Sequence, residues 1–333
     1  MTLDEILRDE LRPNMTLNNQ SVSIKISAAL TILLFVGGLI NSVLSLVTFQ
    51  NEECRQVGCG MYLLASSVTS FLTVSMFTIK FWFVVLSQIN ASTSLSVLGG
   101  GCASIEVMLK SVLYLDGWFN ACIAVERAVQ VFKGVSFDKK KSKHLAWRII
   151  LFLPFCIILT VTHELMYRRL LVYQPETDKT SKDTTERYIS CVARYSPAVQ
   201  DYNTTILFFH LVAPFLANLC SALFIIFGTA RRRSTARVDK SFREHVHEQF
   251  NEHKQLIISP VVLLVLSTPR LIVSLIPDRV KPSENLWLYL SAYFISFIPS
   301  MLIFVIFVLP SELYMKAFKQ LFISTRRRIC TRQ

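Results

Sequence analysis

Charge is scarce in this chain. Only 17% of its 333 residues are charged, whereas 52% are hydrophobic. Soluble globular domains carry about 25% charged residues, so the composition argues against an ordinary soluble domain and favours a membrane protein. The net charge of +12 alone would also suit a nucleic-acid-binding protein. The basic residues cluster beside apolar runs, however, as membrane topology demands, and we expect no nucleic-acid partner.

The chain also lacks the patterns on which catalysis depends. No Cys, His or Asp cluster has the spacing of metal ligands, and no glycine-rich loop is placed to hold a phosphate. His245, His247 and His253 lie together on a predicted helix end, where a solvated helix face explains them better than a metal site. We therefore expect no enzyme, no metal and no cofactor.

Two further absences concern the class of membrane protein. The first residues mix acids with arginines and lack a basic stretch followed by an apolar one, so no cleavable signal peptide is expected. No two apolar runs read as copies of each other, so the inverted repeats of many transporters are not visible. A transporter is an alternative that these features do not favour.

Seven apolar runs are long enough to cross a bilayer as helices. Helices are expected because lipid cannot satisfy the hydrogen bonds of an open backbone. The predicted fold class is an all-α membrane protein, a bundle of seven transmembrane helices. The runs are 24–49, 61–86, 101–132, 145–166, 204–230, 255–276 and 286–310.

The third run carries polar groups at three depths. Cys102 stands near one end, Glu126 and Arg127 near the other, and Asp116 between them. At about 1.5 Å per residue, Cys102 and Arg127 are roughly 37 Å apart, slightly more than a hydrocarbon core of about 30 Å. A carboxylate near the midplane costs about 2.5–3.5 kcal/mol on insertion scales and marks a functional site. Asp116 and Arg127 point to the same side of the helix, so we expect that side to face inward.

Three features place the amino terminus outside. The predicted inner connections and tail hold most of the lysines and arginines, as the positive-inside rule requires. Of the eight cysteines, only Cys102 and Cys191 then fall on the oxidising side, where one disulfide can form. The glycosylation sequons also fall outside or at the outer membrane edge, and they are at Asn14, Asn19, Asn90 and Asn203. We expect a multi-pass protein of the plasma membrane.

These features together resemble the rhodopsin-like (class A) G-protein-coupled receptors. The resemblance covers about residues 22–330 and includes Glu126-Arg127-Ala128, a variant of the family's Asp-Arg-Tyr. The other matching residues are Cys102, Cys191, Asn41, Pro214, Pro269 and Pro310. The chain looks like a divergent invertebrate receptor of the peptide-receptor type. The resemblance implies two partners, an extracellular ligand that is a peptide by preference and a heterotrimeric G protein.

The resemblance assigns the inner end of the third helix to G-protein coupling. In the family the arginine stays with its acidic neighbour at rest and contacts the G protein when active. Glu126 and Arg127 are therefore expected to form an ion pair, with Glu248 as a second candidate partner. An ordinary juxtamembrane charge pair is the alternative.

Departures from the family touch the interior of the bundle. The family's second helix usually carries aspartate at the position of Ser70, and its third more often carries serine at that of Asp116. We expect the two residues to face each other with exchanged roles, and a charged Asp116 could bind sodium through oxygen ligands. The sixth run lacks a tryptophan two residues before Pro269, and the seventh has Pro310 and Tyr314 in place of Asn-Pro-x-x-Tyr. A non-signalling or constitutively active seven-helix scaffold is therefore an alternative.

Charged residues in the outer halves of the spans define the expected ligand pocket. Glu106 and Lys110 are four residues apart and can pair on one helix face. Lys80 and Arg270 would then be unpaired cations available to a ligand carboxylate or carbonyl, with snorkelling to the interface as the alternative. Leu109 stands where amine receptors carry an aspartate, which disfavours a monoamine ligand.

Two flanking segments complete the prediction. Residues 168–173 and 188–195 are expected to be the strands of a hairpin lid, with a disordered glycosylated loop as the alternative. The tail resembles the family's amphipathic eighth helix, which lies on membrane lipids. Its apolar face is Tyr314, Phe318, Leu321 and Phe322, and Cys330 is either palmitoylated or free. The expected units are an extracellular glycosylated terminus 1–23, a seven-helix domain 24–310 and a cytoplasmic tail 311–333.

Overall fold

The structure is a computed structural model of the whole chain. It describes residues 3–7, 10–11, 15–89, 94–173, 188–236, 286–311 and 313–320, and isolated positions between 261 and 272. The predicted sixth span, 255–276, lies largely outside these described residues.

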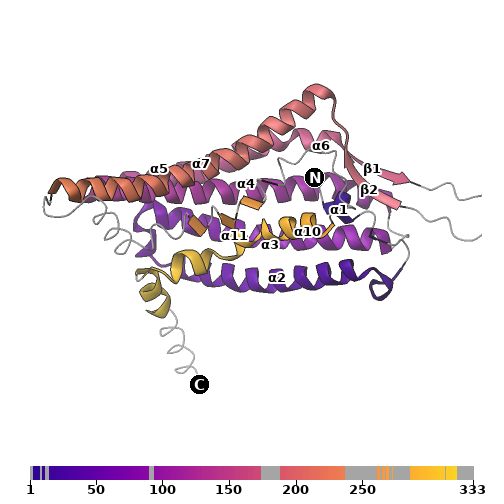
Figure 1. The fold of residues 1–333 in the computed structure, drawn as a ribbon, viewed down its shortest axis with the longest axis horizontal. Helices are drawn as coiled ribbons and strands as arrows, with labels where there is room; N and C mark the ends of the chain where they lie inside the picture. The colour runs from indigo at the N-terminus through magenta and orange to yellow at the C-terminus, as the bar shows by residue number, and fades with distance from the viewer. Residues whose placement is uncertain are drawn as a thin grey trace, which may run out of the picture.

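Five long helices form the body of the molecule (Figure 1). They are α2 (Val22–Phe49), α3 (Gly58–Ile89), α4 (Leu95–Lys133), α5 (Lys139–Val161) and α7 (Pro197–Ala236). These helices are long and apolar enough to cross a membrane, which indicates a membrane-embedded protein. The first five predicted spans are thus confirmed as helices, with ends shifted by a few residues. The three-ten turns beside them are η1 (Leu17–Asn19), η2 (Cys54–Gln56) and η3 (Gly134–Ser136).

Local signals fix several helix ends. The Ser21 side chain accepts a hydrogen bond from the backbone N–H of Ile24 and caps α2. Asp138 caps α5 by accepting from the N–H groups of Lys140 and Lys141. α4 ends at Gly134, whose φ of +53° is a left-handed value that favours glycine.

Helix α4 is the centre of the packing. It contacts α3, α5 and α7, while α3 also contacts α2 and α5. The first two long helices approach closely at Gly38, where an added Cβ would lie 2.8 Å from a methyl carbon of Val74. Polar groups on α4 therefore lie between several other helices.

The last apolar run is broken into pieces. It forms α10 (Leu286–Ile295), α11 (Ile298–Met301) and a π-helical turn, η5 (Phe304–Val308). The prediction of one continuous helix over 286–310 is therefore wrong. Pro299 explains the first break, because it has no N–H to donate to the carbonyl four residues earlier, at Ile295, where α10 ends.

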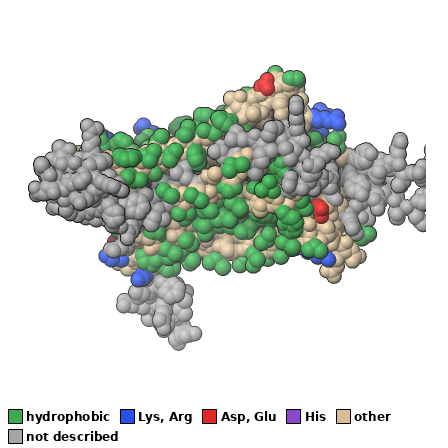
Figure 2. Space-filling model, in the orientation of Figure 1, with side chains coloured by type: hydrophobic (Ala, Val, Ile, Leu, Met, Phe, Trp, Pro, Cys, Tyr) green, Lys and Arg blue, Asp and Glu red, His purple; other side chains and the backbone are tan. Residues whose placement is uncertain are grey.

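Small elements gather at one end of the bundle. α1 (Leu3–Leu7), α6 (His163–Tyr167) and the antiparallel strands β1 (Arg168–Tyr173) and β2 (Tyr188–Ala193) lie there. We call this the hairpin end, and the opposite end, which carries Arg127, the arginine end. On the face shown in Figure 2, hydrophobic side chains cover the middle of the molecule and basic side chains lie toward both ends. The two predicted strands are confirmed.

Candidate functional site

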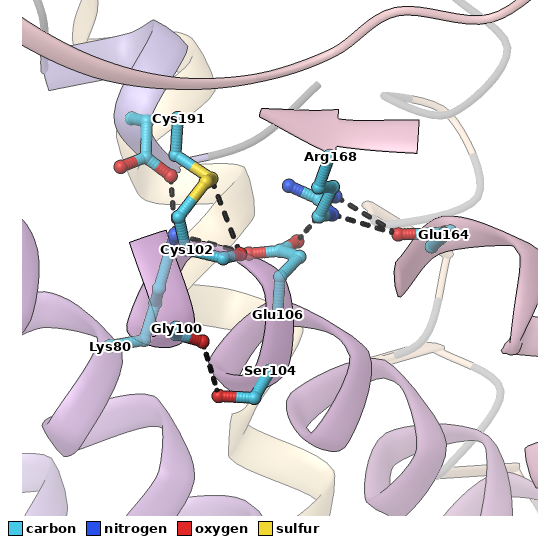
Figure 3. Close-up of a disulfide and its surroundings, with 9 residues drawn as sticks. Lys80, Gly100, Cys102, Ser104, Glu106, Glu164, Arg168 and Cys191 are labelled. Atoms are coloured by element: carbon cyan, nitrogen blue, oxygen red, sulfur yellow. Dashed lines mark hydrogen bonds and ion pairs between the residues drawn. A yellow bond between two sulfur atoms is a disulfide. The ribbon is translucent and has the colours of Figure 1, made fainter. Parts of the chain in front are cut away.

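A disulfide ties the hairpin to the central helix. Cys102 on α4 and Cys191 on β2 are bonded, with 5.5 Å between their Cα atoms, as predicted. Figure 3 shows this bond beside charged side chains from several elements.

The hairpin geometry directs Arg168 toward α4. Leu170 of β1 pairs with Cys191, and Arg168 lies two residues earlier, on the same side of the ribbon. Arg168 is accordingly buried while Arg169 is exposed. On α4, Glu106 lies one turn beyond Cys102, and its Oε1 atom is 3.8 Å from Nη2 of Arg168 (Figure 3).

The charged side chains form one chain of contacts. Glu164 of α6 accepts from Arg168 Nε and Nη2 at 3.1 and 3.0 Å, and from Lys110 Nζ at 2.6 Å. Lys80 Nζ lies 3.4 Å from Glu106 Oε2 and also pairs with Asp4. We call these six residues the ion network: Asp4, Lys80, Glu106, Lys110, Glu164 and Arg168.

The network corrects the predicted ligand pocket. The Glu106–Lys110 pair is wrong, because Lys110 reaches Glu164 instead. Lys80 is not an unpaired cation, because it contacts Glu106 and Asp4 and is only 1% exposed. Arg270, the other predicted cation, lies outside the described residues.

Sequence reasoning missed three members of the ion network. Glu164 and Arg168 are four residues apart, and this spacing could have signalled their pair. Asp4 lies in a short segment whose leucine and isoleucine spacing is helical, which could have signalled a buried face. Leu109, predicted to line the pocket, is buried in one cluster with the apolar residues of that segment.

Burial and neighbouring charges shift the pKa values of Arg168 and Asp4 in opposite directions. Burial acts to lower the pKa of the Arg168 guanidinium, but Glu106 and Glu164 outweigh it and raise that pKa. Burial also raises the pKa of the Asp4 carboxyl, while the Lys80 ammonium acts in the opposite direction. Because the pKa of Asp4 is raised overall, Lys80 offsets only part of the cost of desolvating this carboxyl.

Asp116 is surrounded by hydroxyl groups. Ser66 and Ser70 of α3 donate to its Oδ1 atom at 3.0 and 3.3 Å, and Ser300 of α11 donates to Oδ2 at 2.6 Å. Thr69 lies 3.5 Å from Oδ1, but its single proton has a closer acceptor in the carbonyl of Ser66. We call this group the hydroxyl cage. Among the described residues no lysine, arginine or histidine forms an ion pair with Asp116.

The predicted contact between Ser70 and Asp116 is confirmed. Ser66 and Ser300 were not predicted as partners of Asp116, although Ser66 lies one helical turn from Ser70. The sodium ion suggested for this place stays a prediction.

Asn41 supports the broken last run. Its Oδ1 atom accepts a hydrogen bond from the N–H of Phe304 at 3.1 Å. The N–H is available because Leu302 interrupts the helix just before η5. In α7, Pro214 removes an N–H, and its carbonyl accepts from Asn218 Nδ2 at 3.0 Å. Pro310 follows η5 in a turn, and Pro269 is an isolated described position in helical conformation.

Arg127 contacts the last segment rather than an acid. Its Nη2 atom donates to the Tyr314 hydroxyl at 3.1 Å, and its Nε atom lies 3.1 Å from the Cys59 sulfur. Glu126 accepts from Ser142, with which it makes a short contact, and from Gln130. The predicted Glu126–Arg127 ion pair is therefore wrong within the described part of the chain.

His210 is a buried polar residue that sequence reasoning missed. Trp118 donates to its Nδ1 atom at 3.0 Å, and the Thr160 hydroxyl lies 2.9 Å from Nε2. Tyr114 stacks on its ring. The imidazole thus joins α4, α5 and α7.

The remaining predicted sites are distributed as follows. Asn19 is exposed in η1, and the Asn203 amide oxygen lies 3.1 Å from Nε2 of His163. Their glycosylation stays a prediction. Besides Arg270, the predicted positions outside the described residues are Asn14, Asn90, Glu248, Leu321, Phe322 and Cys330.

Comparison with known proteins supplies no family for this chain. No protein-family model matches the sequence, and no curated protein matches it.

Proposed function

We propose that this chain is a receptor of the rhodopsin-like type in the plasma membrane. It passes the binding of an extracellular ligand, by preference a peptide, to a heterotrimeric G protein. The support is the sequence resemblance together with the contacts between α4 and the C-terminal part of the chain.

Helix α4 contacts the C-terminal segment, which comprises the described residues 286–311 and 313–320, at two depths. Asp116 accepts from Ser300 in the interior, and Arg127 donates to Tyr314 at the arginine end. Farther toward the hairpin end, α10 of the same segment contacts α1. A displacement of this segment would break both hydrogen bonds and release Arg127. This arrangement can transmit an event at the hairpin end to the surface where a G protein would insert.

The competing hypothesis is a seven-helix scaffold that does not signal. It is favoured by the breaks in the last segment and by the engagement of Arg127 with Tyr314. The two hypotheses differ in one measurable property, nucleotide exchange on a G protein.

The experiment screens a peptide library against cells that express the chain, with a second-messenger readout. Each hit is then tested for nucleotide exchange with Arg127→Ala and with Lys133→Ala. Lys133 is an exposed cation in the last turn of the same helix and serves as the matched control. We expect Arg127→Ala to reach the surface and bind the peptide without driving exchange, while Lys133→Ala resembles the wild type. Wild-type exchange in Arg127→Ala would contradict the proposed coupling role.

A further inference from the structure

We propose that the hairpin end contains a binding site for an acidic, aliphatic peptide segment, and that residues 3–7 together with Leu11 of this chain occupy it as an intramolecular ligand. The signalling consequence of this inference rests on the proposed receptor function. The binding site itself does not.

The first support is the burial of the segment. Leu3 and Leu7 are fully buried, and Ile6 and Leu11 are 4% exposed. A helix as short as α1 does not form by itself in water, so its conformation depends on what it packs against. It contacts α3, α10 and β2. Its buried residues belong to one cluster with side chains of those helices and of α2 and α4, among them Ile24, Phe81, Leu109, Tyr289 and Leu290.

The second support is the balance of charge. Without Asp4, the ion network holds three cations, Lys80, Lys110 and Arg168, against two carboxylates, Glu106 and Glu164. Asp4 supplies the third carboxylate and makes the network neutral. An unoccupied site would leave the network with one uncompensated positive charge, because Lys80 would keep only Glu106 as a partner. The site therefore selects a ligand that carries a carboxylate beside aliphatic side chains.

The third support is a donor with no acceptor. The Nη1 atom of Arg168 is buried and has no hydrogen-bond partner among the described residues. A buried guanidinium N–H left unpaired is costly. The site can thus accept one further ligand oxygen beyond the carboxylate of Asp4.

The connection to α2 determines how a free ligand would compete. Leu11 is separated from the cap of α2 at Ser21 by a short stretch of chain. A short linker holds its ligand at an effective concentration on the order of millimolar. A free peptide would therefore compete poorly in the intact chain and well once the connection is cut.

The test keeps the full chain until it has folded. A protease site is inserted between Met15 and Thr16, both of which are exposed, and the protein is cut after reconstitution into lipid nanodiscs. The probe is a fluorescent peptide with the sequence of residues 1–12, and its binding is followed by anisotropy. We expect at least about tenfold tighter apparent binding after the cut. Equal binding before and after it, or no binding in either state, would overturn the inference and leave α1 as ordinary packing.

Matched variants test the charge argument. The peptide with Asp4→Asn should bind at least about tenfold more weakly. The control peptide with Glu10→Gln loses the same charge at a residue without an ion pair in the described structure, so its binding should change less. In the protein, Lys80→Met should weaken binding similarly, and Lys25→Met, at an exposed position of α2, should not. Equal effects of Asp4→Asn and Glu10→Gln would exclude the Asp4–Lys80 contact as the basis of recognition.

A parallel measurement separates this inference from the proposed function. Nucleotide exchange on G proteins is measured with the cut chain, with and without the peptide. Peptide binding without any exchange would leave the binding site standing and count against receptor function. Exchange that occurs although the peptide never binds would support the receptor and overturn the intramolecular ligand.

Discussion

Two buried carboxylates on α4 are stabilised in opposite ways. Glu106 lies within 4 Å of two cations, Lys80 and Arg168. Asp116 instead accepts hydrogen bonds from hydroxyl groups, and no described cation pairs with it. The cations around Glu106 come from α3 and from β1, whereas the donors to Asp116 come from α3 and α11. One carboxylate therefore joins the hairpin to the bundle, and the other joins two helical segments inside it.

The difference predicts different responses to the loss of charge. Removing one member of a buried ion pair leaves its partner uncompensated, which typically costs about 3–5 kcal/mol. A hydrogen bond to a charged group is worth about 1.5–3 kcal/mol, and a cage of several donors retains the others. The ion network should therefore be the more sensitive of the two sites.

The largest effect is expected for Glu106→Gln. This change leaves Lys80 and Arg168 without the carboxylate between them, so we expect a loss of about 3–5 kcal/mol of folding free energy. Thermal unfolding of the purified protein measures it. The double variant Glu106→Gln with Lys80→Met restores the balance of charges in the network, although Asp4 loses its cation, and it should recover part of the loss. A melting temperature equal to that of the wild type would show that the ion network is not buried.

A smaller effect is expected within the hydroxyl cage. Ser300→Ala removes the donor to Oδ2 of Asp116, which has the shortest contact, and should cost about 1.5–3 kcal/mol. Ser70→Ala removes one of two donors to Oδ1 and should cost less. Thermal unfolding of the two variants provides the comparison. A larger loss for Ser70→Ala than for Ser300→Ala would show that the cage is arranged differently.

The exchange of Ser70 and Asp116 tests whether they share one site. Each single change, Ser70→Asp or Asp116→Ser, leaves two carboxylates or none, whereas the double change restores one. Contacting residues typically show coupling of about 0.5–3 kcal/mol, so the double variant should be expressed at the surface better than either single one. Surface labelling of the three variants measures this. Strictly additive losses would argue against a shared site.

The smallest effect is expected for a carboxylate in water. The N–H groups of Lys141 and Lys140 hydrogen-bond to the exposed Asp138 and lower its pKa below the ordinary 3.8. A lowered pKa contributes stability above the unfolded pKa, and this contribution is lost as the pH falls through the folded value. Asp138→Ala should therefore lower the melting temperature slightly at neutral pH and have less effect in strong acid. Lys139→Ala is the control. If the melting temperatures of Asp138→Ala and the wild type differed by the same amount at every pH, the cap would not depend on the charge of Asp138.

Much of the architecture followed from local properties of the sequence. Long apolar runs predicted α2 to α5 and α7, because a helix that crosses a membrane must satisfy its own backbone over about 20 residues. The hairpin strands and the Cys102–Cys191 disulfide were also predicted correctly, the disulfide because the predicted topology left one pair of cysteines on the expected oxidising side. The contact between Ser70 and Asp116 was implied by the resemblance to the receptor family, and it meets the need of a buried carboxylate for polar partners.

The partners of the charged residues were decided by tertiary structure. Helical spacing suggested Glu106 with Lys110 and Glu126 with Arg127, yet Lys110 pairs with Glu164 and Arg127 contacts Tyr314. The sequence determines where apolar segments lie and which side chains are charged, because these are properties of short stretches. It does not determine which distant groups meet, because the energy of a buried charge depends on every element packed around it. That is why the docking of Asp4 on Lys80 became visible only in the folded chain.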